Sequence, residues 1–583
     1  MPVMTIEVDN INSRIVDNVP YMLSRAIGDE LSYIPTFAQY TVAYKAASYR
    51  VDKDGVQQTR KWDGRYFLWN YKKKTFPTGV LPRVRRVLNE HNYKVKIIDK
   101  RNRVKKVKNY EFLADREDNK KINIRYYQQE AIDEALTQSR GIISHATGTG
   151  KTVTFTKLIC DIGVEKTIIF VPTKDLLYQT KYEMENMIRE NGKPVKIGII
   201  GDGNVNIQDI TICIINSALY AYGMRYDYSK HRVIEDKRKR IQAEEKAEKD
   251  TISARAGEIK EFIESVELVI ADECHRASTV LWKTPLSYTY NALYRFGFSA
   301  TPYREDGREM EIEGIFGRII HYYPLEKAIQ EDYLMNPEIY LIKYDYDPMG
   351  AYIKESRDLK EREEEEGEWM ESYEWNYKTT YNEIVVFNED LNQKIAEIAN
   401  KFKNKNMSVL ILVKEYPQGE LIEKYLENGL FLTGKDTSKK RNVTIDMVRN
   451  RDLPVLVATT IADMGLDLPS LDVLIMAGGG GSDPTKFINF KKKSIEKGKW
   501  DIGENNEDNR FGGVIEQRIG RVVRKHENKQ NAIIIDIWHA NKKMKKQSAA
   551  RRKIYKDRKL NSKIINFDEL PWGNWQNQGE KIF

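Results

Sequence analysis

The sequence is poor in cysteine and has no long hydrophobic run. Its 583 residues include three cysteines, Cys160, Cys213 and Cys274, which lie far apart and outside any metal-ligand spacing. We therefore expect reduced structural thiols, and neither a disulfide framework nor a zinc site. No apolar run approaches the roughly 18 residues that span a bilayer, and Met1 to Asn10 has no signal-like apolar core. We expect an intracellular protein without a membrane segment.

Charged residues are abundant and unevenly placed. Hydrophobic residues make up 41% of the chain and charged residues 31%, as in a globular protein long enough for several domains. The net charge of +9 is modest, but Lys45 to Lys108 contains 20 Lys or Arg and 5 Asp or Glu, while Ala540 to Lys563 contains 11 and 1. Each basic segment could therefore face a polyanion such as nucleic acid.

The stretch from Gly141 to Thr152 has the features of a phosphate-binding loop. A short apolar run leads into a turn of glycine and small residues, which ends in Gly-Lys-Thr before a helical pattern. Backbone N–H groups and the helix N-terminus would bind the phosphates of ATP, Lys151 would neutralise them, and Thr152 would help to hold Mg²⁺. His145 stands where the general motif has its first glycine. The predicted ATP contacts from this loop are Thr147, Gly148, Thr149, Gly150, Lys151 and Thr152.

A second pattern is an apolar strand that ends in two adjacent carboxylates. Asp272 can hold Mg²⁺, and Glu273 is then available to orient and deprotonate the attacking water. His275 follows closely, and a later strand ends in Ser299 and Thr301. We predict that the last three residues couple nucleotide hydrolysis to movement.

A third pattern comes late in the chain. On a helix, Gln517, Arg521 and Arg524 are spaced by four and three residues and would share one face. These arginines could form a surface ion-pair stripe, or they could reach the γ-phosphate and assist hydrolysis. We predict the second role.

Between these motifs the chain alternates short apolar runs with helical patterns, which predicts parallel doubly wound sheets. The predicted strands are 167–171, 196–200, 210–215, 268–271, 296–298, 339–344, 409–413, 455–458 and 471–476. Polar insertions are predicted at about 222–264, 350–380 and 482–513. The second of these is acidic, with 10 Asp or Glu and 3 Lys or Arg between Glu355 and Glu374.

The first 110 residues read as a small domain that contacts DNA. Strands are predicted at 40–50 and 66–71, with a turn at 61–65, and a helix from Leu81 to His91. Basic residues interleave with aromatic ones, as in surfaces that hold a phosphate backbone, although a solvated basic face over an aromatic core is the alternative. The predicted contacts are Lys61, Trp62, Arg65, Lys72, Lys73, Lys74 and Arg83.

Taken together, the motifs resemble those of superfamily 2 helicases of the DExH type, in the family's order, over about residues 125 to 540. The resemblance implies that Gln128 reads the adenine edge. It implies that Gly465 and Asp467 contact ATP, and that Pro172, Thr173 and Thr459 contact the nucleic acid. It also implies an α/β fold of two RecA-like parallel-sheet motor domains, with a small α+β N-terminal DNA-binding domain.

A closer resemblance, to the UvsW-type and XPB-like DNA helicases, is carried by two segments. One is Trp62 to Arg65 followed by Thr75 to Val80, and the other is Arg304 to Asp306 directly after Ser-Ala-Thr-Pro. This resemblance implies remodelling of branched or duplex DNA, with single strands as a further substrate, in recombination, repair or replication. It allows recombination or replication proteins as partners and the host cytoplasm as the location if the source is viral.

The expected domains are a basic DNA-binding domain (1–110), a first motor domain (111–335), a second motor domain (336–540) and a basic tail (541–583). The expected cofactors are ATP and Mg²⁺. Three alternatives remain open on the residues alone: an RNA helicase, the motor subunit of a restriction or remodelling complex, and a non-catalytic nucleic-acid scaffold.

Overall fold

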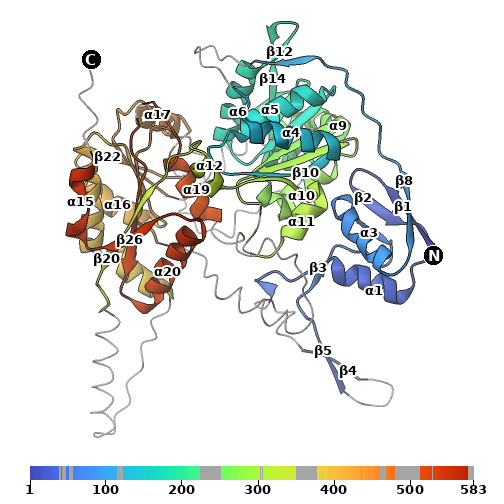
Figure 1. The fold of residues 1–583 in the computed structure, drawn as a ribbon, viewed down its shortest axis with the longest axis horizontal. Coiled ribbons are helices and arrows are strands. Elements are labelled where there is room, and N and C mark those ends of the chain that lie inside the picture. Colours follow the sequence, from blue (N-terminus) through green and yellow to red (C-terminus); the bar gives the residue numbers. More distant parts are fainter. Residues whose placement is uncertain are drawn as a thin grey trace. The chain divides into compact units, whose positions relative to one another are not determined.

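The chain folds into two compact units. Among the described residues, the first comprises Met1–His145 and Gly150–Pro324, and the second comprises Ala146–Thr149 and the residues from Leu325 onward. The structure is a computed structural model (Figure 1). It describes residues 1–38, 41, 47–51, 57–113, 123–223, 251–302, 304, 306–348, 377–434, 436, 438–459, 468–479, 513–527 and 529–575. Most of each predicted insertion lies outside these residues. Within them, no helix is long and apolar enough to cross a membrane, and all three cysteines are buried and unpaired.

The first unit contains an eight-stranded sheet in the order β15-β14-β16-β11-β17-β18-β10-β19. Every neighbouring pair is parallel except β14 and β15. Its strands are β10 (Arg140–His145), β11 (Thr167–Val171), β14 (Ile197–Gly201), β15 (Asn204–Asn206), β16 (Ile210–Ile214), β17 (Leu268–Asp272), β18 (Tyr294–Ser299) and β19 (Ile319–Tyr323). Because both faces are covered by helices, the central strands β11, β16 and β17 are buried along their whole length.

Two groups of helices cover this sheet, one on each face (Figure 1). One face carries α4 (Tyr126–Gln138), α5 (Lys151–Ile162) and α6 (Lys174–Met187). The other carries α7 (Ile215–Ala221), α9 (Ala256–Ser265), α10 (Val280–Ser287) and α11 (Glu309–Phe316). A small three-stranded sheet of β9 (Tyr110–Phe112), β12 (Ile188–Glu190) and β13 (Lys193–Pro194) lies outside this sandwich.

The second unit contains a seven-stranded, fully parallel sheet in the order β22-β23-β21-β24-β25-β20-β26. Its strands are β20 (Glu338–Tyr344), β21 (Val409–Leu412), β22 (Gly429–Leu432), β23 (Val455–Ala458), β24 (Val473–Met476), β25 (Ile533–His539) and β26 (Ser562–Ile565). Its helices are α12 (Leu325–Gln330), α14 (Tyr377–Tyr381), α15 (Glu389–Lys403), α16 (Tyr416–Lys424), α17 (Ser438–Arg449), α19 (Gly513–Val522) and α20 (Lys542–Asp557). The predicted α/β class with two parallel-sheet domains is confirmed.

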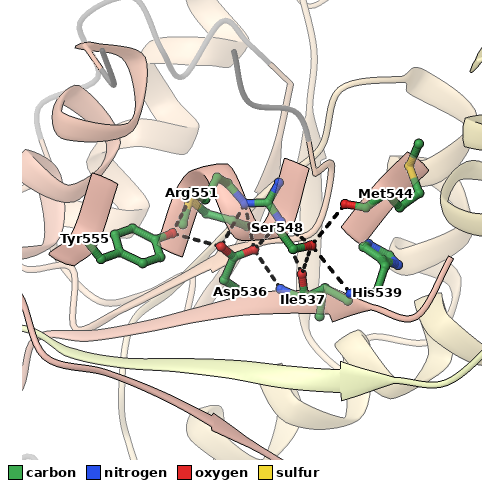
Figure 2. Close-up of polar contacts among 8 residues, drawn as sticks. Asp536, Ile537, His539, Met544, Ser548, Arg551 and Tyr555 are labelled. Carbon is green, nitrogen blue, oxygen red and sulfur yellow. Dashed lines mark hydrogen bonds and ion pairs between the residues drawn. The ribbon is translucent and has the colours of Figure 1, made fainter. Parts of the chain in front are cut away.

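The structure differs from the predicted basic tail after residue 540. Helix α20 packs on β25 through a buried ion pair between Arg551 and Asp536 (Figure 2). Strand β26 then pairs in parallel with β20 at the edge of the sheet. The basic composition concealed a buried stripe at helical spacing, so this segment is part of the second sheet domain rather than an appendage.

A separate small domain begins the first unit. Its sheet, in the order β7-β2-β1-β8, is packed by two helices. The elements are β1 (Val3–Val8), β2 (Asn12–Ile15), α1 (Tyr21–Glu30), β7 (Thr75–Pro77), the 3₁₀ turn η2 (Thr78–Val80), α3 (Leu81–Glu90) and β8 (Lys94–Asp99). A Cβ on Gly79 of η2 would lie 2.0 Å from the carbonyl oxygen of Glu313 in α11. The absence of a side chain at Gly79 therefore permits this close contact with the motor fold.

The strand pairing in this domain differs from the prediction. The predicted strands 40–50 and 66–71 do not pair with each other. Instead β4 (Ala47–Val51) pairs with β5 (Gln57–Lys61), and β6 (Tyr66–Phe67) pairs with β3 (Ser32–Tyr33). The dipeptide Asp54-Gly55 is a strong hairpin signal between β4 and β5 that the prediction overlooked.

Candidate active site

The candidate site is built around the loop that joins β10 to α5. Gly148 and Gly150 have φ angles of +86° and +82°, in the left-handed region that glycine tolerates best. Thr149 Oγ1 donates to the carbonyl of Ala146 at 2.7 Å and closes the turn. Helix α5 begins at Lys151, so an anion at this loop would meet the positive end of a twelve-residue helix.

Gln128 lies directly under the loop. Its Oε1 accepts from the backbone N–H of Arg125 at 2.9 Å, and its Nε2 donates to the carbonyl of Gly150 at 3.3 Å. The side chain is 3% exposed. In this arrangement the side-chain amide of Gln128 supports the loop. To bind an adenine, the amide would have to exchange at least one of these two hydrogen bonds. The adenine contact stays a prediction.

His145, which replaces the usual glycine, is fully buried. Its Nε2 lies 2.9 Å from Nδ1 of His321, whose other nitrogen is 3.6 Å from a carboxylate oxygen of Glu130. Burial, and then the neighbouring His321 and Lys151, hold the pKa of His145 well below its usual value. The imidazole at this position is therefore neutral. Its partner is 176 residues away in sequence, which is why sequence patterns gave no sign of it.

Asp272 and Glu273 lie at the end of β17, where the strand leaves the sheet. The backbone N–H of Glu273 donates to Asp272 Oδ1 at 2.9 Å, and Glu273 has a left-handed φ of +53°. Burial and the charge of Glu273 raise the pKa of Asp272 to about 7. Although burial opposes it, a hydrogen bond from His275 and the charge of Lys151 lower the pKa of Glu273 to about 2. Asp272 is buried and Glu273 is half-buried, with 23% of its side chain exposed, and both lie within the electrostatic reach of Lys151.

The three predicted coupling residues form one hydrogen-bonded chain. His275 Nδ1 lies 3.2 Å from Glu273 Oε2 and 3.1 Å from Ser299 Oγ. Ser299 Oγ accepts from the backbone N–H of Thr301 at 3.2 Å. The end of β17 is thereby connected to the end of β18. The predicted coupling role of these residues stays a prediction.

The residues present fit a magnesium ion. Carboxylate and hydroxyl oxygens are the ligands that Mg²⁺ prefers, and Asp272 and Thr152 supply one of each. The raised pKa of Asp272 means that a buried carboxylate lacks full compensation for its charge, and a bound cation would supply it. The structure gives no distances for such an ion.

Several predicted nucleic-acid contacts have other partners. Arg65 pairs with Asp63 at 2.6 Å and with Asp29 at 2.5 Å. Arg83 pairs with Glu313 at 2.8 Å and with Glu30 at 3.0 Å. Trp62 donates to the carbonyl of Arg65, and Lys74 donates to the carbonyl of Asp17. Lys72 and Lys73 are exposed, and Lys61 lies in β5. The two arginines among the predicted contacts are thus committed to ion pairs within the first unit.

The remaining predicted contacts are dispersed. Pro172 and Thr173 follow β11, and Thr173 Oγ1 accepts from the N–H of Leu176 at 3.3 Å as the cap of α6. Thr459 follows β23 and is 5% exposed. Gly465 and Asp467 lie outside the described residues.

Helix α19 carries Gln517 and Arg521 but ends at Val522, so Arg524 is not on the predicted helical face. The backbone carbonyls at the end of α19 accept hydrogen bonds from a side chain and not from a further turn of helix. Lys529 Nζ donates to the carbonyl of Val522 and, at 3.0 Å, to that of Arg524. Burial lowers the pKa of Lys529 to about 7, against the opposing charge of Asp472. Lys529 is therefore the cap of this helix, a role that sequence reasoning missed.

We expect Lys529→Met to lower kcat for ATP hydrolysis by about 10- to 100-fold. The substitution removes the cap of α19, so the arginines that we predict to assist hydrolysis lose their fixed position. Stability should change little, since the lost hydrogen bonds are offset by relief of a buried charge. Steady-state kinetics and urea unfolding measure the two effects. Lys525→Met is the matched control, because Lys525 is half-exposed and pairs only at the surface with Asp332. An unchanged kcat in a folded Lys529→Met protein would contradict the positioning role.

Two family models match the chain. Residues 121–304 match "Type III restriction enzyme, res subunit" and residues 389–526 match "Helicase conserved C-terminal domain". The first range contains Lys151 and the Asp272–Glu273 pair, and the second contains most of the strands of the second sheet and helix α19.

Three curated proteins are similar in sequence. Putative helicase 22 of Sulfolobus islandicus filamentous virus is 28% identical over 295 residues, 50% of this chain and 45% of that protein. DNA 3'-5' translocase XPB2 of Sulfurisphaera tokodaii is 25% identical over 442 residues, 72% of this chain and 82% of that protein. ATP-dependent DNA helicase uvsW of Enterobacteria phage T4 is 21% identical over 495 residues, 82% and 81% respectively. The match spans less than half of the first relative and most of the other two.

Proposed function

We propose that this chain is a superfamily 2 helicase that uses ATP hydrolysis to move on DNA and to remodel branched DNA. The remodelling comprises unwinding, branch migration, fork reversal or annealing. The observation that carries the proposal is the Asp272–Glu273 pair, one carboxylate buried and the other half-buried, within the electrostatic reach of Lys151 at the phosphate loop. The choice of DNA rests on the relatives named as a DNA translocase and a DNA helicase.

In the proposed reaction Lys151 and the N-terminus of α5 bind the β- and γ-phosphates of ATP. Thr152 and Asp272 hold Mg²⁺, which when bound neutralises charge on the phosphates. Glu273, kept ionised by His275 and Lys151, orients the attacking water and accepts its proton. His275 passes a change in the charge of Glu273 to Ser299, and so to the end of β18.

The test is ATP hydrolysis measured without nucleic acid and with single-stranded DNA, duplex DNA, a four-way junction and RNA. We expect the largest stimulation with the junction, and strand displacement on the same substrate. Stimulation by RNA alone would instead make the protein an RNA helicase. An absence of hydrolysis under every condition would contradict the motor function.

A second candidate is the motor subunit of a restriction complex, because the first family model is described by such a subunit. A motor of this kind translocates on duplex DNA without separating its strands. The discriminating result would be strong stimulation by plain duplex, with equal activity on junctions and no strand displacement.

A further inference from the structure

Helix α20 of the second unit has two faces of opposite character. The buried face comprises Met544, Ser548, Ala550, Arg551, Ile554 and Tyr555. The exposed face is basic and comprises Lys542, Lys545, Lys546, Arg552, Lys553 and Lys556. Asp557 is the one acidic residue in the helix. The helix therefore presents a continuous row of positive charge to its surroundings, here called the α20 basic face.

The α20 basic face is not neutralised by the described part of the chain. None of its six side chains forms an ion pair there; Arg552 lies over the ring of Trp538, with 5.9 Å from its guanidinium carbon to the ring centroid. This differs from the N-terminal domain, where Arg65, Arg83 and Arg86 all pair with carboxylates. The positive charge of α20 is thus available to a partner.

Helix stability does not account for this pattern. Lys542, Lys545 and Lys546 lie at the N-terminal end of α20, where positive charge opposes the helix dipole, and the first turn has no acidic residue. The pairs Lys542–Lys546 and Arg552–Lys556 place like charges four residues apart, which also destabilises a helix. An arrangement that costs stability and is nevertheless held in place points to a binding role.

The helix is held by a buried network (Figure 2). Arg551 donates to both carboxylate oxygens of Asp536 in β25, with distances of 2.8 Å from Nε to Oδ2 and from Nη2 to Oδ1. Tyr555 donates to the same carboxylate at 2.9 Å, and Ser548 donates to the carbonyl of Ile537 at 2.8 Å. The three polar side chains that anchor the helix, Ser548, Arg551 and Tyr555, therefore face the sheet, and the α20 basic face points away from it.

We propose that the α20 basic face binds the phosphate backbone of duplex DNA as a contact of the second motor unit. The inference rests on the proposed function for the identity of the polyanion. From Lys542 to Lys556 the face spans about 21 Å at 1.5 Å per residue, and duplex DNA carries a charge about every 1.7 Å of its axis. Five of the six charges are lysines, which act as point charges toward phosphates and do not read base edges. The contact is independent of sequence.

The test replaces Lys545, Lys546, Arg552 and Lys553 together with glutamine. The logarithm of the binding constant for a blunt duplex is measured against the logarithm of salt concentration. Each lost phosphate contact lowers the slope by about 0.9, so we expect a decrease of about 2 to 4 and weaker binding at low salt. The four side chains are exposed and their charges oppose helix stability, so the unfolding midpoint should not fall and the DNA-independent ATPase rate should not change.

The matched control replaces Lys394, Lys401, Lys424 and Lys440 of the same unit with glutamine. It makes the same change in net charge, but three of these lysines pair with carboxylates and Lys401 lies against aromatic rings. Three results would each overturn the proposal. The control could lose as much slope as the α20 variant, the α20 variant could keep the wild-type slope, or the loss could occur with duplex RNA and not with DNA. Wild-type ATPase stimulation by DNA is measured in parallel. If DNA stimulates the wild-type ATPase while the salt slope of the α20 variant is unchanged, the proposed function stands and only this DNA contact is refuted.

Discussion

Replacing Glu273 with glutamine is expected to lower the rate of ATP hydrolysis by about 10²- to 10⁴-fold, because the substitution removes the base and keeps the size of the side chain. Glu273 is half-buried just after β17, and its carboxylate contacts His275 at 3.2 Å. The hydrogen bond from His275 and the charge of Lys151 keep its pKa low against burial. The carboxylate is therefore ionised at any pH used for assays.

The measurement is steady-state hydrolysis with and without DNA, together with binding of a fluorescent ATP analogue. Binding should remain close to that of the wild type, because Lys151 and the phosphate loop are untouched. Glu267→Gln is the control: Glu267 immediately precedes the same strand at its other end and accepts from the backbone N–H of Glu165. A hydrolysis rate within a factor of about three of the wild type in Glu273→Gln would rule out a role as base.

The second large effect is expected in the buried ion pair that joins α20 to β25. Arg551 is 1% exposed and Asp536 is fully buried. Asp536→Asn leaves the guanidinium buried without its counter-charge, which costs about 3–5 kcal/mol. Arg551→Met should destabilise by a similar amount, because the carboxylate then keeps only neutral donors from Tyr555 and the backbone of Ile537.

The double variant Asp536→Leu with Arg551→Met is expected to be far less destabilised than the sum of the two single changes, since both charges are removed together. Urea unfolding of the full chain, with proteolysis to report on the second unit, would measure this. Additive effects in the double variant would show that the two side chains contribute independently. The same variants loosen α20, so their DNA affinity should fall with their stability.

The sequence predicted most of the central strands of both sheets, for a physical reason, but missed β25 in the second sheet. Strands buried on both faces, such as β11 and β17, appear as uninterrupted apolar runs. The phosphate loop and the Asp272–Glu273 pair are local patterns that occupy consecutive residues. Local chemistry of this kind can be read without knowing the tertiary structure.

Features that depend on distant residues could not be predicted. The partner of His145 is a histidine on the neighbouring edge strand β19, far away in sequence, and the cap of α19 is Lys529, which follows an irregular segment. From the sequence, arginines of the N-terminal domain such as Arg83 look free to bind nucleic acid. Their carboxylate partners, among them Glu313, come from other elements and cannot be recognised in the sequence. In α20 the high density of lysine concealed the buried face built on Arg551 and Tyr555.

The strand order of the second sheet has a consequence for synthesis of the chain. Strand β20 is the first of this sheet to be translated, yet its two neighbours are β25 and β26, which end at His539 and Ile565. About two hundred residues must therefore leave the ribosome before β20 can form a single hydrogen bond within its sheet. During that interval an apolar strand is exposed, so the nascent second unit should depend on chaperones far more than the first, whose sheet is completed by Tyr323.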